Sequence, residues 1–212
     1  MKKTLLSAVV AASLILTLGG AALADGPETS APAVPETEFY TPGDVPAAVP
    51  AQDAMAPAIH AALLAMLNNG DAAFAADSSM TAWEALYNML SIYGQLDARS
   101  EYRDGQLVLP TETVLDYAAA LFPSAPDLTR LPASLADRMV YDADSDSYLL
   151  ACGDDGLSEI QVRTASETGG QLTLSGGLVY LVDGSDLASF TAVLAPRDSL
   201  CGYQLVSLTM DA

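Results

Sequence analysis

The spacing of apolar residues changes once along this chain, near Met139. In three segments before it, residues 54–68, 79–93 and 112–121, apolar side chains recur three to four positions apart, as on one face of a helix. After residue 139 apolar and polar residues alternate, as they do along strands with one covered face, for example in Ile160, Val162 and Thr164. Helices followed by strands predict an α+β fold, in which helices pack against an antiparallel sheet.

Three helices are expected, over residues 54–68, 79–93 and 112–121. The first is rich in alanine and has one apolar stripe, and its Pro57 is tolerated only if it lies in the first turn. Ser78 or Ser79 is suited to cap the second helix, and Thr111 the third. Between the second and third helices, Asp104-Gly105 predicts a tight turn in a hairpin over residues 101–109.

The second half of the chain predicts a meander of six strands, with residues 123–138 as a proline-containing connector before them. The expected strands are 139–142, 147–152, 158–166, 171–182, 188–195 and 202–210. The predicted architecture is therefore three N-terminal helices packed on one face of a C-terminal antiparallel sheet. By the order of its elements alone, this layout is analogous to cystatin-like and nuclear-transport-factor-like folds, whose sheets are curved.

Several short segments are similar to a loose group of uncharacterised exported bacterial proteins. They are Trp83-Glu84-Ala85-Leu86-Tyr87, Tyr93-Gly94, Leu109-Pro110, Tyr117-Ala118, Leu121-Phe122, Val140-Tyr141-Asp142, Ser147-Tyr148, Thr191-Ala192-Val193-Leu194 and the run from Gly202 to Leu208. The resemblance covers residues 80–212. It implies a helix and a hairpin followed by a small antiparallel sheet, and it implies no particular activity.

The N-terminus has the pattern of a Sec-type signal peptide over residues 1–24. Lys2 and Lys3 are followed by an uncharged apolar stretch, Leu5–Leu18, and then by the small residues of Ala22-Leu23-Ala24. We expect cleavage after Ala24 and a secreted, extracytoplasmic protein; an uncleaved N-terminal anchor is the alternative. Residues 25–50 are rich in proline, alanine and acids and predict a disordered linker, which leaves residues 51–212 as one domain with no further membrane span.

The chain is strongly acidic, with 27 Asp and Glu against eight Lys and Arg and a formal net charge of −19. Cleavage after Ala24 would also remove both lysines. Such a charge repels nucleic acid and anionic lipid surfaces, and it suits solubility, cations or basic partners.

The run Asp142-Ala-Asp144-Ser-Asp146 is the main candidate for a metal site. Alternate carboxylates can give hard oxygen ligands to one calcium ion, although the glycine and the glutamate of an EF-hand loop are missing here. The competing interpretation is a polar hairpin turn between Tyr141 and Tyr148, in which Asp and Ser make local hydrogen bonds. No other cofactor is indicated.

Three further residues bear on chemistry. Cys152 and Cys201 could form a disulfide in an oxidising compartment, and two buried free thiols are the alternative. His60 is the only histidine, so a His-containing catalytic relay would have to use it; a surface or packing role is the simpler interpretation. No G-x-S-x-G, Walker or G-x-G-x-x-G motif is present.

These patterns predict an exported, non-enzymatic module that binds a protein, a glycan or a small ligand through its sheet face or loops. Two alternatives stay open. One is a small extracytoplasmic enzyme with an Asp/Tyr-based pocket between helices and sheet, and the other is a weak calcium-binding module.

The intact mass of the exported protein tests the predicted compartment directly. We expect the mature chain to begin at Asp25, because the signal peptidase cuts after small residues. A disulfide would show in the same spectrum as a mass lower by two hydrogen atoms. A chain that keeps residues 1–24 and stays with the membrane would contradict the cleaved signal.

Overall fold

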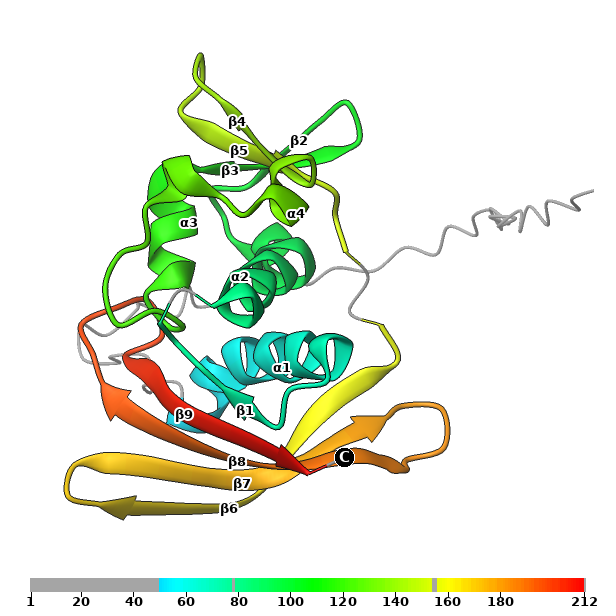
Figure 1. Ribbon diagram of the computed structural model, residues 1–212, viewed down its shortest axis with the longest axis vertical. Helices are drawn as coiled ribbons and strands as arrows, with labels where there is room; N and C mark the ends of the chain where they lie inside the picture. Colours follow the sequence, from blue (N-terminus) through cyan, green and yellow to red (C-terminus); the bar gives the residue numbers. More distant parts are fainter. Residues whose placement is uncertain (1–49, 78, 154–155, 212) are drawn as a thin grey trace, which may run out of the picture. The chain divides into compact units, whose positions relative to one another are not determined.

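Two apolar helices lie between two β-sheets in the computed structural model (Figure 1). The structure describes residues 50–77, 79–153 and 156–211. The helices are α1 (Ala51–Asn69) and α2 (Met80–Tyr93), which pack directly on one another. The predicted signal peptide and nearly all of the predicted linker lie outside the described residues. Within those residues, no helix is long and apolar enough to cross a membrane.

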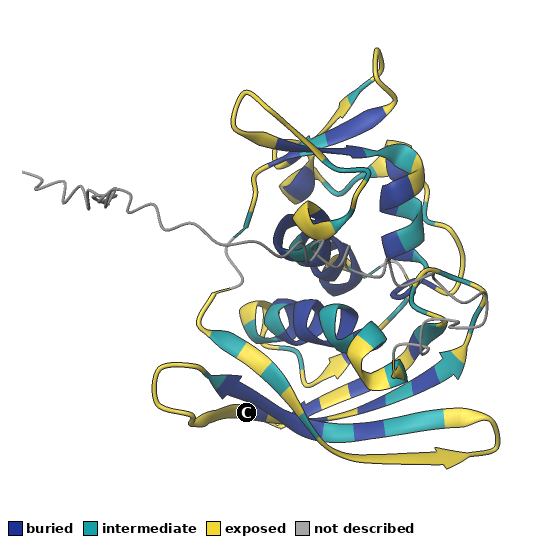
Figure 2. Ribbon diagram, turned by 180° about the vertical axis from the view of Figure 1, so that it is seen from behind, coloured by how far each residue is buried: buried dark blue, intermediate teal, exposed yellow. Residues whose placement is uncertain are grey.

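The middle of helix α1 is buried around its whole circumference. Every residue from Ala58 to Leu63 is at most 1% exposed, and six consecutive positions cover more than one helical turn (Figure 2). Its alanines present little bulk, so α2 and a sheet can approach from opposite sides. Helices that are apolar all round belong to the interior of a protein. The helix ends at Gly70, whose φ of 72° lies in the left-handed region that glycine adopts without strain.

Helix α1 begins three residues earlier than expected, at Ala51, and Pro57 therefore lies inside it. The expectation that Pro57 occupies the first turn is wrong. Ser79 caps α2 as predicted, because its side chain accepts a hydrogen bond from the backbone N–H of Ala82 at 3.2 Å.

The larger sheet has five antiparallel strands in the order β1-β9-β8-β7-β6, and α1 packs on it. Its strands are β1 (Ala73–Phe74), β6 (Ser158–Thr168), β7 (Gln171–Tyr180), β8 (Asp186–Pro196) and β9 (Tyr203–Asp211). Strands β6 to β9 correspond to the last four of the six strands in the predicted meander. Buried and exposed positions alternate through most of β8, so this strand keeps one face on the core.

The smaller sheet has four antiparallel strands in the order β2-β3-β5-β4. They are β2 (Glu101–Arg103), β3 (Gln106–Pro110), β4 (Met139–Asp142) and β5 (Ser147–Leu150). Asp104 and Gly105 form the predicted turn, both with positive φ. Helix α3 (Thr111–Ala118) follows β3, and the connector to β4 holds two short pieces, the 3-10 helix η2 (Leu128–Arg130) and α4 (Ala133–Ala136). A third short piece, η1 (Gly94–Leu96), follows α2.

The structure is α+β, as the sequence predicts, but its strands form two sheets where a single C-terminal sheet was expected. The predicted hairpin and the first two strands of the predicted meander pair with one another instead of joining the later strands. The physical reason is that α2 is buried at ten of its 14 positions, so it needs cover on the side away from α1. One apolar core runs through the helices and both sheets. The analogy with cystatin-like folds stays a prediction.

Candidate functional site

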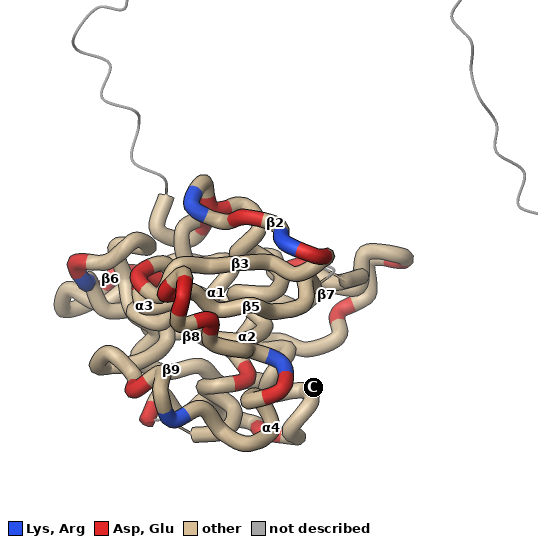
Figure 3. Tube along the Cα trace, turned by 90° about the horizontal axis from the view of Figure 1, so that it is seen from above, with Lys and Arg blue, Asp and Glu red and all other residues tan. Residues whose placement is uncertain are grey.

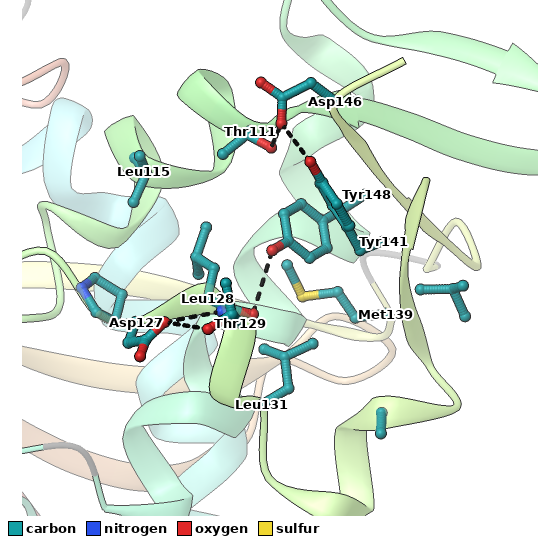
Figure 4. A pocket seen from close by; sticks show the side chains of 13 residues that line it. Thr111, Leu115, Asp127, Leu128, Thr129, Leu131, Met139, Tyr141, Asp146 and Tyr148 are labelled. Carbon is teal, nitrogen blue, oxygen red and sulfur yellow. Dashed lines mark hydrogen bonds between the residues drawn. The ribbon is translucent and has the colours of Figure 1, made fainter. Parts of the chain in front are cut away.

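A cavity of about 580 Å³ opens between α3, the connector with η2 and α4, and the β4–β5 hairpin (Figure 4). Its volume lies in the range of small-molecule sites. The walls are largely apolar, with Leu115, Leu128, Leu131, Ala136, Met139 and Val140. The polar side chains at its edge are Thr111, Asp127, Thr129, Tyr141, Asp146 and Tyr148.

Asp146 links α3 to the β4–β5 hairpin at one side of the cavity. Its Oδ1 accepts hydrogen bonds from the Thr111 hydroxyl at 2.8 Å and from the Tyr141 hydroxyl at 2.9 Å. Its backbone oxygen accepts the Thr111 N–H at 2.9 Å. The φ of Asp146 is 46°, a left-handed conformation that aspartate and asparagine tolerate better than most residues. The turn before β5 is thereby fastened to the start of α3.

Two tyrosines form the aromatic part of the wall. Tyr141 and Tyr148 are opposite one another in the β4–β5 register, and their ring centroids lie 5.2 Å apart at an interplanar angle of 47°. Tyr148 is 3% exposed and its hydroxyl donates to the Leu128 carbonyl at 3.2 Å, whereas Tyr141 is 49% exposed. The hydrogen bond to Asp146 raises the pKa of Tyr141, and burial raises the pKa of Tyr148.

Asp127 lies at the other edge of the cavity, where it caps η2. Its Oδ1 accepts the Thr129 N–H at 3.1 Å and the Thr129 hydroxyl at 2.6 Å. These bonds lower the pKa of the Asp127 carboxyl, with a smaller contribution from Arg130, whose Nε lies 3.2 Å from Oδ2. Asp127 is therefore held as a carboxylate.

The three aspartates of the predicted calcium site have different surroundings. Asp142 accepts hydrogen bonds from the Asp144 N–H and the Ser145 hydroxyl, and it pairs with Arg103 at 3.1 Å. The Ser145 hydrogen bond is the main reason that its pKa is lowered. Asp144 is exposed at the turn, and Asp146 belongs to the cavity.

These contacts match the polar hairpin turn that the sequence offered as the alternative to a metal site. Among the residues that the structure describes, no group of three or more His, Cys, Asp or Glu side chains is placed to hold a metal ion. Calcium binding at Asp142, Asp144 and Asp146 stays a prediction.

The two cysteines are free thiols in the structure, and the possible disulfide is not formed. Cys152 is exposed rather than buried, and its Sγ lies 3.2 Å from both the Tyr102 hydroxyl and Gln95 Oε1. Cys201 is half-buried and lines a second, smaller cavity of about 330 Å³. Burial raises the pKa of the Cys201 thiol, which lowers its reactivity.

His60 has the packing role that the sequence favoured. It is 1% exposed on α1, its Nδ1 lies 2.6 Å from the Tyr93 hydroxyl of α2, and its Nε2 lies 3.1 Å from the Ser158 hydroxyl of β6. One buried ring therefore links both central helices to the larger sheet.

Sequence reasoning missed most of the cavity. It took Thr111 as the cap of α3, whereas Thr111 is the first residue of that helix and its hydroxyl bonds Asp146. The sequence predicts a connector over residues 123–138, and in the structure this segment supplies one wall of the cavity. A usable signal was present in Tyr141 and Tyr148, because a hairpin centred between them makes them cross-strand neighbours.

No protein-family model, curated protein or solved structure matches the chain.

The contact between Tyr141 and Asp146 predicts a measurable pKa. We expect Tyr141 to titrate above the ordinary value of a tyrosine, because its O–H donates to a carboxylate whose charge opposes ionisation. In Asp146→Asn the hydrogen bond can persist but the charge is gone, so the Tyr141 pKa should fall. The measurement is an NMR pH titration of ¹³Cζ-labelled tyrosine, with the signal assigned from Tyr141→Phe. Asp144→Asn is the matched control, and equal Tyr141 pKa values in wild type and Asp146→Asn would refute the contact.

Proposed function

We propose that this protein is an exported, non-enzymatic binding module, and that the cavity between α3, the connector and the β4–β5 hairpin is its ligand site. The cavity itself carries the proposal: about 580 Å³ of space with apolar walls, an aromatic pair and a few oxygen atoms at defined positions. Small-molecule sites have this composition, in which apolar surface supplies affinity and a few polar groups set orientation. The ligand class is therefore a small organic molecule or a side chain of a larger partner.

The built-in contacts favour binding with little rearrangement. Asp146 fixes α3 to the hairpin, Tyr148 fixes the hairpin to η2, and Asp127 fixes the first turn of η2. A site that is already ordered loses less conformational entropy when a ligand enters.

The same contacts favour binding over catalysis. Tyr141 donates a hydrogen bond to a carboxylate and has a raised pKa, which is opposite to what an activated phenolate nucleophile or base requires. Among the described residues, the cavity lining contains no His, Lys, Arg or Cys. An Asp/Tyr-based enzyme is the alternative, and it would have to use these same two residue types.

The place of action is part of the proposal. The signal-peptide pattern of residues 1–24 and the proline-rich composition of residues 25–50 support export and a spacer ahead of the domain. The resemblance to exported bacterial proteins supports the same compartment.

Ligand-observed NMR with a panel of small soluble aromatic and aliphatic compounds tests the proposed site. We expect compounds that bind wild type to lose about tenfold in affinity in Tyr141→Ala, because the aromatic wall is removed. Tyr102→Ala is the matched control, since Tyr102 is an exposed tyrosine of the same sheet that does not line the cavity. A panel without binders, or binders that Tyr141→Ala leaves unchanged, would refute this site.

A further inference from the structure

We infer that the ligand of this cavity is an organic cation, an ammonium or guanidinium group on an apolar body. The inference rests on the proposed function and adds the chemical class of the ligand.

The hydrogen-bond donors of the lining side chains are already engaged within the protein. Four hydroxyls line the cavity, and each has one hydrogen to donate. Thr111 and Tyr141 donate to Asp146, Thr129 donates to Asp127, and Tyr148 donates to the Leu128 carbonyl. What these side chains can still offer is acceptor lone pairs on carboxylate and hydroxyl oxygens. A ligand that makes hydrogen bonds with them must therefore bring the donors itself.

The two charged side chains that line the cavity are both carboxylates. Asp127 and Asp146 lie at its edge, and no described lining residue is basic (Figure 4). Arg130 already pairs with Asp127 beside the cavity, whereas Asp146 has no ion pair among the described residues. An anionic ligand would meet the unpaired carboxylate of Asp146, and an ammonium or guanidinium group would gain a charge-assisted hydrogen bond there.

The aromatic pair adds to the preference for a cation. A cation over a tyrosine face is attracted by the ring quadrupole, and Tyr141 lines the cavity and is half-exposed. The apolar walls from the leucines and Met139 then accommodate the body that carries the charge. A bare metal ion would make no use of these walls.

Among the described residues, no arginine competes with a cationic ligand for the carboxylate of Asp146. Each of the domain's six arginines already has an internal partner. Arg99 pairs with Asp97 and Asp116, Arg103 with Asp142, Arg130 with Asp127, Arg138 with Glu84 and Arg163 with Asp186, while Arg197 donates to the Ala119 and Phe122 carbonyls. Acidic positions outnumber basic ones along the trace (Figure 3), so the surrounding field attracts cations.

The test compares three ligands of similar size that each carry a phenyl ring: 2-phenylethylammonium, 2-phenylethanol and phenylacetate. Isothermal titration calorimetry of the intact mature protein should give an affinity for the ammonium about tenfold above that for the alcohol, the size expected for a charge-assisted hydrogen bond. Phenylacetate should bind more weakly than either. Added salt should weaken binding of the ammonium and leave the alcohol nearly unchanged.

Asp146→Asn supplies the matched variant, because asparagine tolerates the same backbone conformation and can still accept both hydroxyls. It should remove about tenfold of the ammonium affinity and lower the alcohol affinity by much less, because only the ammonium loses the attraction between opposite charges. Asp127→Asn gives a second variant with the same expectation if Asp146→Asn does not fold. Asp144→Asn on the same hairpin does not line the cavity and should change neither.

A free amine and a basic side chain share this chemistry, and acetyl-Leu-Lys-Leu-amide distinguishes them. Tighter binding of the peptide than of 2-phenylethylammonium would assign the site to a lysine side chain of a partner, and weaker binding would assign it to a free amine. If the alcohol or phenylacetate binds at the cavity as tightly as the ammonium, the cation is refuted while the binding site stands. If none of the three ligands nor the peptide binds, this inference is refuted, and the broader compound panel decides the proposed site separately.

Discussion

The burial of α1 on all sides is the constraint on which the rest of this structure depends. A helix with six consecutive buried positions cannot lie on the surface of a sheet; it needs apolar cover on both sides. The five-stranded sheet covers one side and α2 the other, and α2 in turn is buried at ten of its 14 positions. The smaller sheet, α3 and the connector complete the core on the far side of α2. The cavity lies where these three parts of the structure meet.

Several local features were predictable because residues close together in the sequence determine them. Strand β4 has the predicted bounds, the Asp104-Gly105 turn has the positive φ that such turns need, and Ser79 caps α2. The number of sheets was not predictable in the same way, since strand alternation shows which face of a strand is covered but not which strands pair. The missed clue was the small, apolar surface that Ala58, Ala61 and Ala62 add beside the stripe of larger residues.

The candidate site was predictable only in fragments. The sequence singled out Asp146 as a candidate metal ligand and Tyr141 as one end of the alternative hairpin turn. Their actual surroundings depend on Thr111, which lies 35 positions away from Asp146, and on a connector without a periodic pattern. Long-range contacts of this kind leave no signal in residue spacing. The chemical character of the site depends on which side chains donate hydrogen bonds and which accept them, and only the three-dimensional structure shows this.

Chemical-shift mapping tests the central claim most directly. In a ¹⁵N-labelled sample of the mature chain, 2-phenylethylammonium should shift the amide signals of residues 111–115, 127–131 and 139–148, the three segments that surround the cavity. Signals of the second cavity, around Leu96, Leu200 and Cys201, should stay in place. Shifts confined to that second cavity, or spread over the whole acidic surface, would contradict the account.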